Sequence, residues 1–139
     1  MVRSFRIVAM FVALALLTQQ AAAQESKAAK ATREKLKQVI AEFEAKEVGT
    51  KAFFEDVNRE LDKSINFKID NTSGISNNTK LTFKAKKITV EKLLNDLSDK
   101  YEFGWYVVSN AKDRNDGWVM VRKFKDKERG YESGKEPKK

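Results

Sequence analysis

The segment from Lys80 to Phe124 decides the fold that this sequence predicts. It contains four patterned pieces, which read Leu81-Thr-Phe-Lys-Ala85, Thr89-Val-Glu-Lys-Leu-Leu-Asn-Asp-Leu-Ser-Asp-Lys-Tyr101, Gly104-Trp-Tyr-Val-Val108 and Gly117-Trp-Val-Met-Val121. Apolar residues alternate in the first piece, recur every three or four residues in the second, and join β-branched residues in the last two. The segment therefore predicts a strand, an amphipathic helix and two further strands.

The helix of this segment is expected to begin at Thr89, a residue type whose side chain accepts a hydrogen bond from the first helical turn. Lys92 stands where a full capping box has Glu or Gln, so only half of that motif is present. One face of the helix carries Val90, Leu93, Leu94, Leu97 and Tyr101. Because burying a large apolar side chain contributes about 1.5–3 kcal/mol, this face is expected to supply much of the core.

The two strands after the helix are separated by a polar stretch, Asn110-Ala-Lys-Asp-Arg-Asn-Asp-Gly117. A glycine-containing polar loop between strands rich in valine and aromatic residues predicts an antiparallel hairpin. Gly117 supplies the residue that adopts a positive φ where the chain re-enters the sheet.

A further helix and strand are expected upstream. Thr50 is a suitable N-cap for a helix to about Lys63, with an apolar stripe of Phe53, Phe54, Val57 and Leu61. The period then changes to two, since Ile65, Phe67 and Ile69 alternate with polar residues. This alternation predicts a half-buried strand.

Residues 24–49 are rich in Ala, Lys and Glu and predict an N-terminal amphipathic helix, strongest over residues 30–46. Its apolar face contains Leu36, Val39, Ile40 and Phe43, and Gly49 is suited to end it. Three alternatives stay open: the helix packs on the core of the domain, it is reserved for a partner, or it is partly disordered toward its Ala-rich start.

Both ends of the chain predict segments outside the folded domain. Residues 1–23 place two arginines before an apolar run and end in three alanines, which is the layout of a signal peptide cleaved near Ala23. The run from Ile7 to Leu17 is shorter than the ~20 residues that span a membrane, and an uncleaved anchor is the alternative. Residues 126–139 are charged and lack an apolar repeat, which predicts a disordered tail.

Composition excludes several classes of chemistry. The 139 residues include no cysteine and no histidine, so disulfides, thiol nucleophiles, thiolate metal sites and the commonest catalytic base are absent. A secreted domain without disulfides is held together by packing alone, which fits a bacterial envelope compartment. The net charge of +8 keeps binding to a polyanion among the alternatives.

The carboxylates that remain do not form a catalytic or metal-binding motif. Asp113 and Asp116 lie near Asn110 and Asn115, but they lack the alternating spacing and the downstream Glu of a calcium loop. Asp96 and Asp99 lie on the solvated side of the predicted helix. We therefore expect no enzyme activity, no cofactor and no metal site.

The stretch from Leu81 to Val108 resembles the short domain at the N-terminus of secretins and TonB-dependent receptors. In that family, too, an alternating strand leads to a Thr or Ser helix start, a Leu-Leu-x-x-Leu helix, a Gly and an aromatic strand. The resemblance covers about residues 53–124. Small secreted versions in planctomycete-type bacteria also have endings like Asp116-Gly-Trp-Val-Met-Val-Arg122 and Glu128-Arg-Gly-Tyr131.

This resemblance implies a small α+β domain over residues 50–125 that works in the periplasm or the outer-membrane space. Its implied role is protein contact, signalling or assembly. Because the shared motif defines a core, it implies no functional residue.

The sequence thus predicts an α+β fold in which two or three helices pack on one face of a small, three- to four-stranded, mainly antiparallel sheet. The expected function is that of an exported, non-enzymatic protein-interaction module, periplasmic or secreted, whose partner is another envelope protein and not a nucleic acid. Candidate contact residues outside the apolar pattern are Lys84, Lys86, Lys87, Tyr106, Lys112 and Arg114.

The alternative is an envelope structural or polyanion-binding protein that acts through its basic tail and loops. Aromatic residues would then form a stacking surface flanked by basic side chains. The aromatic residues in question are Trp105, Tyr106, Trp118 and Phe124, and the basic ones are Lys84, Lys86, Lys87, Arg122 and Lys123.

Overall fold

A computed structural model describes residues 25–123 and 128–137 of the chain, so the predicted signal peptide lies outside the described residues. The elements follow in the order α2 (Lys27–Lys35), β1 (Val39–Gly49), α3 (Thr50–Arg59), β2 (Phe67–Ile69), β3 (Lys80–Thr89), α4 (Val90–Tyr101), β4 (Phe103–Val107), β5 (Val119–Lys123) and β6 (Arg129–Gly130). No helix among these residues is long and apolar enough to span a membrane.

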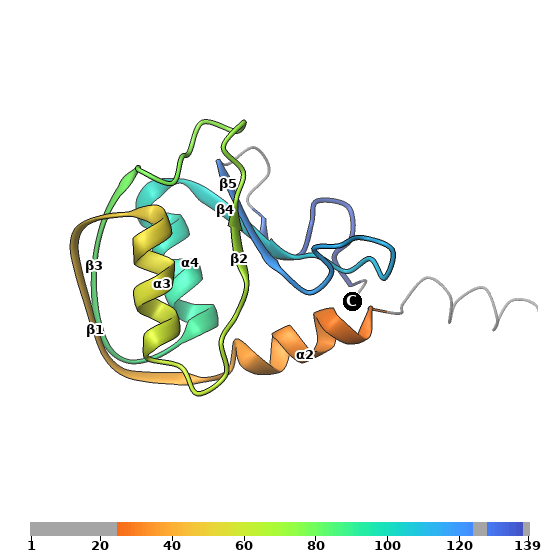
Figure 1. Ribbon diagram of the computed structural model, residues 1–139, viewed down its shortest axis with the longest axis horizontal. Helices are drawn as coiled ribbons and strands as arrows, with labels where there is room; N and C mark the ends of the chain where they lie inside the picture. Colours follow the sequence, from red (N-terminus) through yellow and green to blue (C-terminus); the bar gives the residue numbers. More distant parts are fainter. Residues whose placement is uncertain (1–24, 124–127, 138–139) are drawn as a thin grey trace, which may run out of the picture.

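The strands form two separate sheets with two helices between them (Figure 1). β1 and β3 pair in antiparallel fashion as a two-stranded sheet, here called the ribbon, and the other sheet has the order β2-β5-β4-β6. Helices α3 and α4 lie between the ribbon and this four-stranded sheet, while α2 lies across one end. The predicted α+β class is confirmed.

The arrangement of the sheets differs from the single sheet that the sequence predicted. The helices are covered on both sides, and within the larger sheet only β4 and β5 pair antiparallel, because β2 runs parallel to β5 and β6 parallel to β4. The predicted hairpin corresponds to β4 and β5, and the strand predicted from the alternation of Ile65, Phe67 and Ile69 corresponds to β2.

Aromatic side chains join the two sheets through α3. Phe53 packs edge-on against Phe43 of the ribbon, with ring centroids 5.2 Å apart, and Phe54 stacks on Phe67 of β2 at 4.5 Å. The apolar face of α4 is buried as predicted, with Leu93, Leu94 and Leu97 almost inaccessible to solvent. One core therefore holds both sheets.

The predicted helix over residues 24–49 is wrong beyond Lys35. The chain leaves α2 there, and residues 39–49 form β1, which pairs with β3. Within β1 the buried Phe43 and Ala45 alternate with the exposed Glu42 and Glu44, so burial against the helices outweighs the helix propensity of an Ala-, Glu- and Lys-rich segment.

The two predicted helix caps have different outcomes. Thr89 caps α4 as expected, because its Oγ1 accepts a hydrogen bond from the backbone N–H of Lys92 at 3.2 Å. Thr50 does not cap α3: the cap residue is Gly49, and the buried Thr50 hydroxyl donates to the carbonyl of Thr79 at 2.7 Å.

The prediction of a disordered tail over residues 126–139 is wrong for its described central part. Residues 129 and 130 form β6 on the outer edge of β4, and the preceding Glu128 is only 5% exposed. The physical reason is a paired charge, since the Glu128 carboxylate meets Arg122 of β5 inside the fold. Residues 126, 127, 138 and 139 lie outside the described part of the chain.

Candidate interaction surfaces

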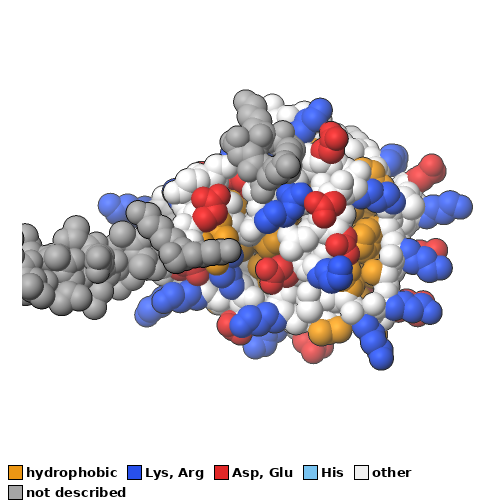
Figure 2. Space-filling view, turned by 180° about the vertical axis from the view of Figure 1, so that it is seen from behind, with side chains coloured by type: hydrophobic (Ala, Val, Ile, Leu, Met, Phe, Trp, Pro, Cys, Tyr) orange, Lys and Arg blue, Asp and Glu red, His pale blue; other side chains and the backbone are white. Residues whose placement is uncertain are grey.

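The outer face of the ribbon carries rows of opposite charge. Lys84 lies opposite Glu44 across the register, and Lys86 lies opposite Glu42. All four side chains are exposed, as expected of the two lysines. Figure 2 shows positive and negative side chains interspersed along the right-hand margin of the molecule, where the ribbon lies. The two predicted contact lysines are therefore on a charge-balanced surface and do not form a basic patch.

Lys87 marks a bend in the ribbon. Its φ is +48°, a left-handed conformation that is uncommon for a residue with a side chain. At the same level both strands turn two consecutive residues outward, Ala41 and Glu42 on β1 and Lys86 and Lys87 on β3. At this bend the ribbon curves around α3 and α4 (Figure 1). The side chain of Lys87 is exposed, but its backbone conformation helps to set the shape of the ribbon.

The free edge of β3 is capped by side chains from α4. The backbone N–H of Thr82 donates to the Tyr101 hydroxyl at 2.7 Å, and the Thr82 carbonyl accepts from the same hydroxyl at 3.1 Å and from Lys100 Nζ at 2.7 Å. These contacts occupy the backbone N–H and C=O of Thr82, which an incoming strand would otherwise use. They are a form of the edge protection that sheet proteins need against unwanted pairing.

The free edge of β1 has a different character. In a strand, the N–H and C=O groups of successive residues point to alternate edges. Thr82 is exposed and its N–H points to Tyr101, away from β1, so the exposed residues at alternate positions of β3 also direct their backbone groups away from β1. In an antiparallel pair of strands, two residues directly opposite each other either form backbone hydrogen bonds with each other or both direct their backbone groups to the outer edges. Glu42 and Glu44, opposed to Lys86 and Lys84, therefore present their N–H and C=O groups at the open edge of β1.

Tyr106 is not the exposed contact residue that the sequence predicted. It is 8% exposed on β4, where the guanidinium of Arg122 lies 5.0 Å from its ring centroid and β6 pairs with β4 at Tyr106 itself. Burial raises the pKa of the Tyr106 hydroxyl above the usual tyrosine value, against the opposing effect of the Arg122 charge. The residue supports the packing of the C-terminal segment and is not available to a partner.

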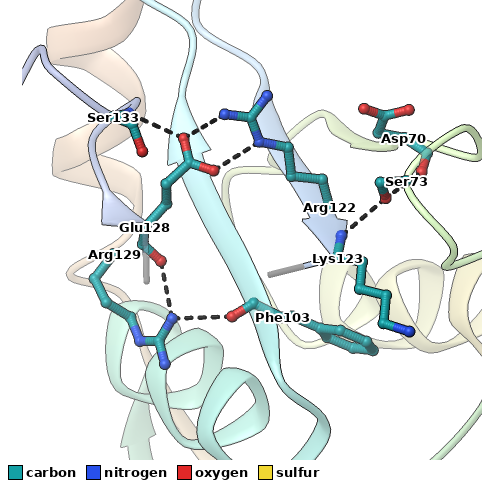
Figure 3. Close-up of polar contacts among 8 residues, drawn as sticks. All are labelled: Asp70, Ser73, Phe103, Arg122, Lys123, Glu128, Arg129 and Ser133. Carbon is teal, nitrogen blue, oxygen red and sulfur yellow. Dashed lines mark hydrogen bonds and ion pairs between the residues drawn. The ribbon is translucent and has the colours of Figure 1, made fainter. Parts of the chain in front are cut away.

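The C-terminal segment is held by a bidentate ion pair (Figure 3). Arg122 donates from Nε and Nη2 to the two carboxylate oxygens of Glu128, at 2.6 and 2.7 Å, and this contact raises the pKa of Arg122. The backbone N–H of Ser133 donates to the same carboxylate at 3.0 Å. Gly104 leaves space for the Glu128 side chain, since a Cβ at position 104 would lie 3.3 Å from the Glu128 Cβ.

Two further contacts fix the neighbourhood of this pair. Arg129 donates to the backbone carbonyl of Phe103 at 2.9 Å and pairs with Asp99 of α4 at 2.8 Å. On the other side of the sheet, the N–H of Lys123 donates to the Ser73 hydroxyl at 2.8 Å. Polar contacts from distant parts of the chain thus hold the larger sheet at more than one place.

Lys112 and Arg114 lie in the exposed loop between β4 and β5, as expected. The carboxylates of this loop serve its turns: Asp113 accepts from the N–H of Asn115 at 2.8 Å, and Asp116 accepts from the N–H of Asn110 at 3.0 Å. Within the described ranges no group of three or more acidic side chains is placed to hold a metal ion. Local turns, together with a hydrogen bond of 2.5 Å from the hydroxyl of Ser26 at the start of α2 to Asp116, account for these carboxylates.

The aromatic and basic residues expected for polyanion stacking are not brought together. Trp105 is buried, and its Nε1 donates to Asn95 of α4 at 2.9 Å. Lys84, Lys86 and Lys87 lie on the ribbon, on the far side of the helices from β4 and β5. Phe124 lies outside the described residues.

A cleft of about 420 Å³ lies between α2 and the C-terminal segment. One wall is formed by Arg33, which pairs with Glu25 at 2.6 Å and lies 3.8 Å from the ring centroid of Tyr131. Lys37 in the same lining pairs with Glu34 at 3.0 Å. Most of its charges are satisfied by one another, so the cleft mainly joins α2 to the segment that follows β6.

The residues that sequence reasoning missed are those of the β1 edge. The alternation in Glu42-Phe-Glu-Ala-Lys46 was a strand signal, but the helical spacing of Leu36, Ile40 and Phe43 competed with it. Glu128 gave no signal, because a single acidic residue in a charged tail does not reveal a buried partner.

No protein-family model, curated protein or solved structure matches this chain.

Proposed function

We propose that this protein is an exported, non-enzymatic interaction module of the bacterial periplasm or outer-membrane space, and that it binds another envelope protein by accepting a strand at the free edge of β1. The observation that carries this proposal is the contrast between the two ribbon edges. Among residues 25–123 and 128–137, the 11-residue β1 pairs with β3 alone, while the edge of β3 is capped at Thr82.

Strand addition uses groups that the ribbon already presents. Backbone N–H and C=O groups on an open edge supply affinity, and side chains at alternate positions supply specificity. The helices beneath the ribbon hold β1 in place through Phe43 and Phe53, so an incoming strand meets an ordered template. By comparison, the outer strands of the larger sheet, β2 and β6, have three and two residues.

Export and cellular location rest on the sequence. The arginines, apolar run and alanines of residues 1–23 support a signal peptide, and the absence of cysteine fits a domain that is held by packing. The resemblance to the short N-terminal domain of secretins and TonB-dependent receptors supports the same compartment and a role in protein contact.

Polyanion binding has less support. Lys84 and Lys86 face Glu44 and Glu42 on the ribbon, and Lys112 and Arg114 lie on a loop of the other sheet. Binding to a sulfated polysaccharide that falls steeply between low and moderate salt would favour that alternative.

The experiment compares two proline variants in the protein lacking residues 1–23. Glu44→Pro removes an N–H from the open edge of β1, and Lys84→Pro removes one from the opposite edge of the same cross-strand pair. Each is used to capture partners from an envelope extract after circular dichroism confirms its fold. We expect Glu44→Pro to lose a partner that Lys84→Pro retains. Equal capture by both variants would contradict docking at β1.

A further inference from the structure

We infer that the strand accepted by β1 is basic: an extended protein segment with Lys or Arg at two alternating positions, opposed to Glu42 and Glu44. This inference rests on the proposed docking at β1 and adds the chemistry of the partner. It comes from the two carboxylates that lie on the open edge itself; Lys46, exposed at the next alternating position of β1, would oppose a third side chain of the incoming strand.

The two carboxylates are placed for cross-strand pairing. Glu42 and Glu44 expose their side chains on the outer face of the ribbon and turn their backbone groups to the open edge. Residues directly opposed in neighbouring strands have Cβ atoms about 4.5–5.5 Å apart, within reach of a charge pair. A strand added at this edge therefore places two of its own alternating side chains beside these carboxylates.

The carboxylates are also available for such pairing. Neither Glu42 nor Glu44 forms an ion pair or a side-chain hydrogen bond with another residue of the described ranges. Lys86 and Lys84 lie across the register on the other side, but without contacts short enough to be ion pairs. Both acidic side chains are therefore exposed, and unpaired among the described residues, on the outer face of the strand whose edge is open.

The lysines of β3 do not reverse the expected preference of the β1 edge for a basic strand over an acidic one. Strands are spaced by about 4.8 Å, so a basic side chain added beside β1 lies about 10 Å from Lys84 and Lys86, close to the distance over which salt screens charges. The same side chain lies about half as far from Glu42 or Glu44. Attraction to the nearer carboxylates therefore dominates, while an acidic strand would set like charges directly opposite each other.

Val39 adds an apolar contact at the start of the same edge. Its side chain is 61% exposed, and it is the one exposed large hydrophobic residue in the described part of the chain. It lies on the outer face of β1, as Glu42 and Glu44 do. An apolar residue at one end of the incoming segment would cover it.

A second copy of this chain is the competing occupant, because β3 carries alternating lysines. In that strand, however, the edge that would pair is occupied at Thr82 by Tyr101 and Lys100. The structure therefore favours a separate protein over self-association.

The test uses three synthetic nine-residue peptides in which threonine and valine alternate with Lys, Gln or Glu. Each is labelled and titrated with the protein lacking residues 1–23, and binding is followed by fluorescence anisotropy. We expect the Lys peptide to bind tightest and the Glu peptide weakest, with about tenfold between them from two cross-strand charge pairs. Sedimentation of the protein alone is expected to show no self-association through β1.

Charge reversal separates the inference from its alternatives. The double variant Glu42→Lys with Glu44→Lys is expected to prefer the Glu peptide, while Lys84→Glu with Lys86→Glu, the matched change on the capped strand, should keep the original order. Circular dichroism checks that both are folded. Equal binding of all three peptides, lost in Glu44→Pro, would overturn the basic partner but leave docking at β1 intact. Binding that Glu44→Pro does not weaken, or no binding of any peptide, would contradict docking itself.

Discussion

The two sheets of this protein share one core, but they differ in how far their edges are covered by the rest of the chain. The four-stranded sheet has short outer strands and is closed by the chain itself, through β6 and the Arg122–Glu128 pair. The ribbon has strands of 11 and 10 residues, charges on its outer face and one uncapped edge. This contrast indicates a division of roles, in which the larger sheet anchors the termini of the fold and the ribbon remains accessible.

The largest expected effect comes from the core that both sheets share. Leu97 is 1% exposed on α4, so Leu97→Asp buries an unpaired carboxylate and should remove more than about 4 kcal/mol from the free energy of unfolding. We expect circular dichroism to show both sheets lost together. The exposed α3 residue Lys51 provides a control, because Lys51→Asp should change stability by less than about 0.5 kcal/mol. Survival of either sheet in Leu97→Asp would mean that the cores are separate.

The next effect concerns the junction of α2 with the larger sheet. Gly117 has φ +82°, and a Cβ there would lie 2.8–2.9 Å from atoms of Ala28. Gly117→Ala should therefore destabilise by more than the 1–2 kcal/mol that the left-handed conformation alone costs. Gly134, with φ +84° and nothing within 4 Å of a Cβ, isolates that conformational cost. Chemical denaturation measures both; an equal loss in the two variants would show that α2 does not press on Gly117.

A third prediction compares one acidic residue from each sheet. Glu128→Gln replaces a buried carboxylate that receives two bonds from Arg122, and should destabilise by about 1–3 kcal/mol. Glu44→Gln, on the exposed face of the ribbon, should change stability by less than about 0.5 kcal/mol. Urea unfolding monitored by tryptophan fluorescence measures both. Equal losses of stability in the two variants would contradict the distinction between the four-stranded sheet, which the Arg122–Glu128 pair closes, and the ribbon, whose acidic side chains are exposed.

The smallest expected effect is a pH dependence at the end of β2. The hydroxyl of Thr72 donates to Asp70 at 2.6 Å and lowers the pKa of that carboxyl, with a smaller contribution from the charge of Arg122. Because the folded pKa lies below the unfolded one, the stabilisation is present above the unfolded value and is lost as the pH falls through the folded pKa. Thr72→Val should raise the pKa of Asp70, measured by NMR titration of its carboxyl carbon. An unchanged titration would assign the lowered pKa to the backbone N–H of Thr72, which donates to the same carboxyl at 3.0 Å, and to the charge of Arg122.

The part of the fold that could be predicted from the sequence is the part set by local signals. Helix α4 has its cap at Thr89 and its apolar stripe within one short segment, and the β4–β5 hairpin has its turn residues between its strands. These features depend on neighbours in the sequence. They were therefore readable without knowledge of the tertiary contacts.

The parts that were missed depend on distant residues. β1 is a strand because Phe43 and Ala45 are covered by α3 and paired with β3, which lies far along the chain, and its composition favours a helix until that burial is known. Glu128 is buried because Arg122 neutralises it and Gly104 leaves space for it. For the candidate site, the exposure of Lys84 and Lys86 was predicted. The glutamates that lie opposite them in the register, and the open edge of β1, were not predicted.

Hydrogen exchange of single backbone amides, followed by NMR, tests the open edge most directly. We expect fast exchange at Glu42 and Glu44, whose N–H groups face the free edge of β1, and slow exchange at Phe43 and Ala45, which bond to β3. The amide of Thr82 should also be slow, because it donates to the Tyr101 hydroxyl. Slow exchange at Glu42 and Glu44 in the free protein would show that this edge is already covered and cannot accept a strand.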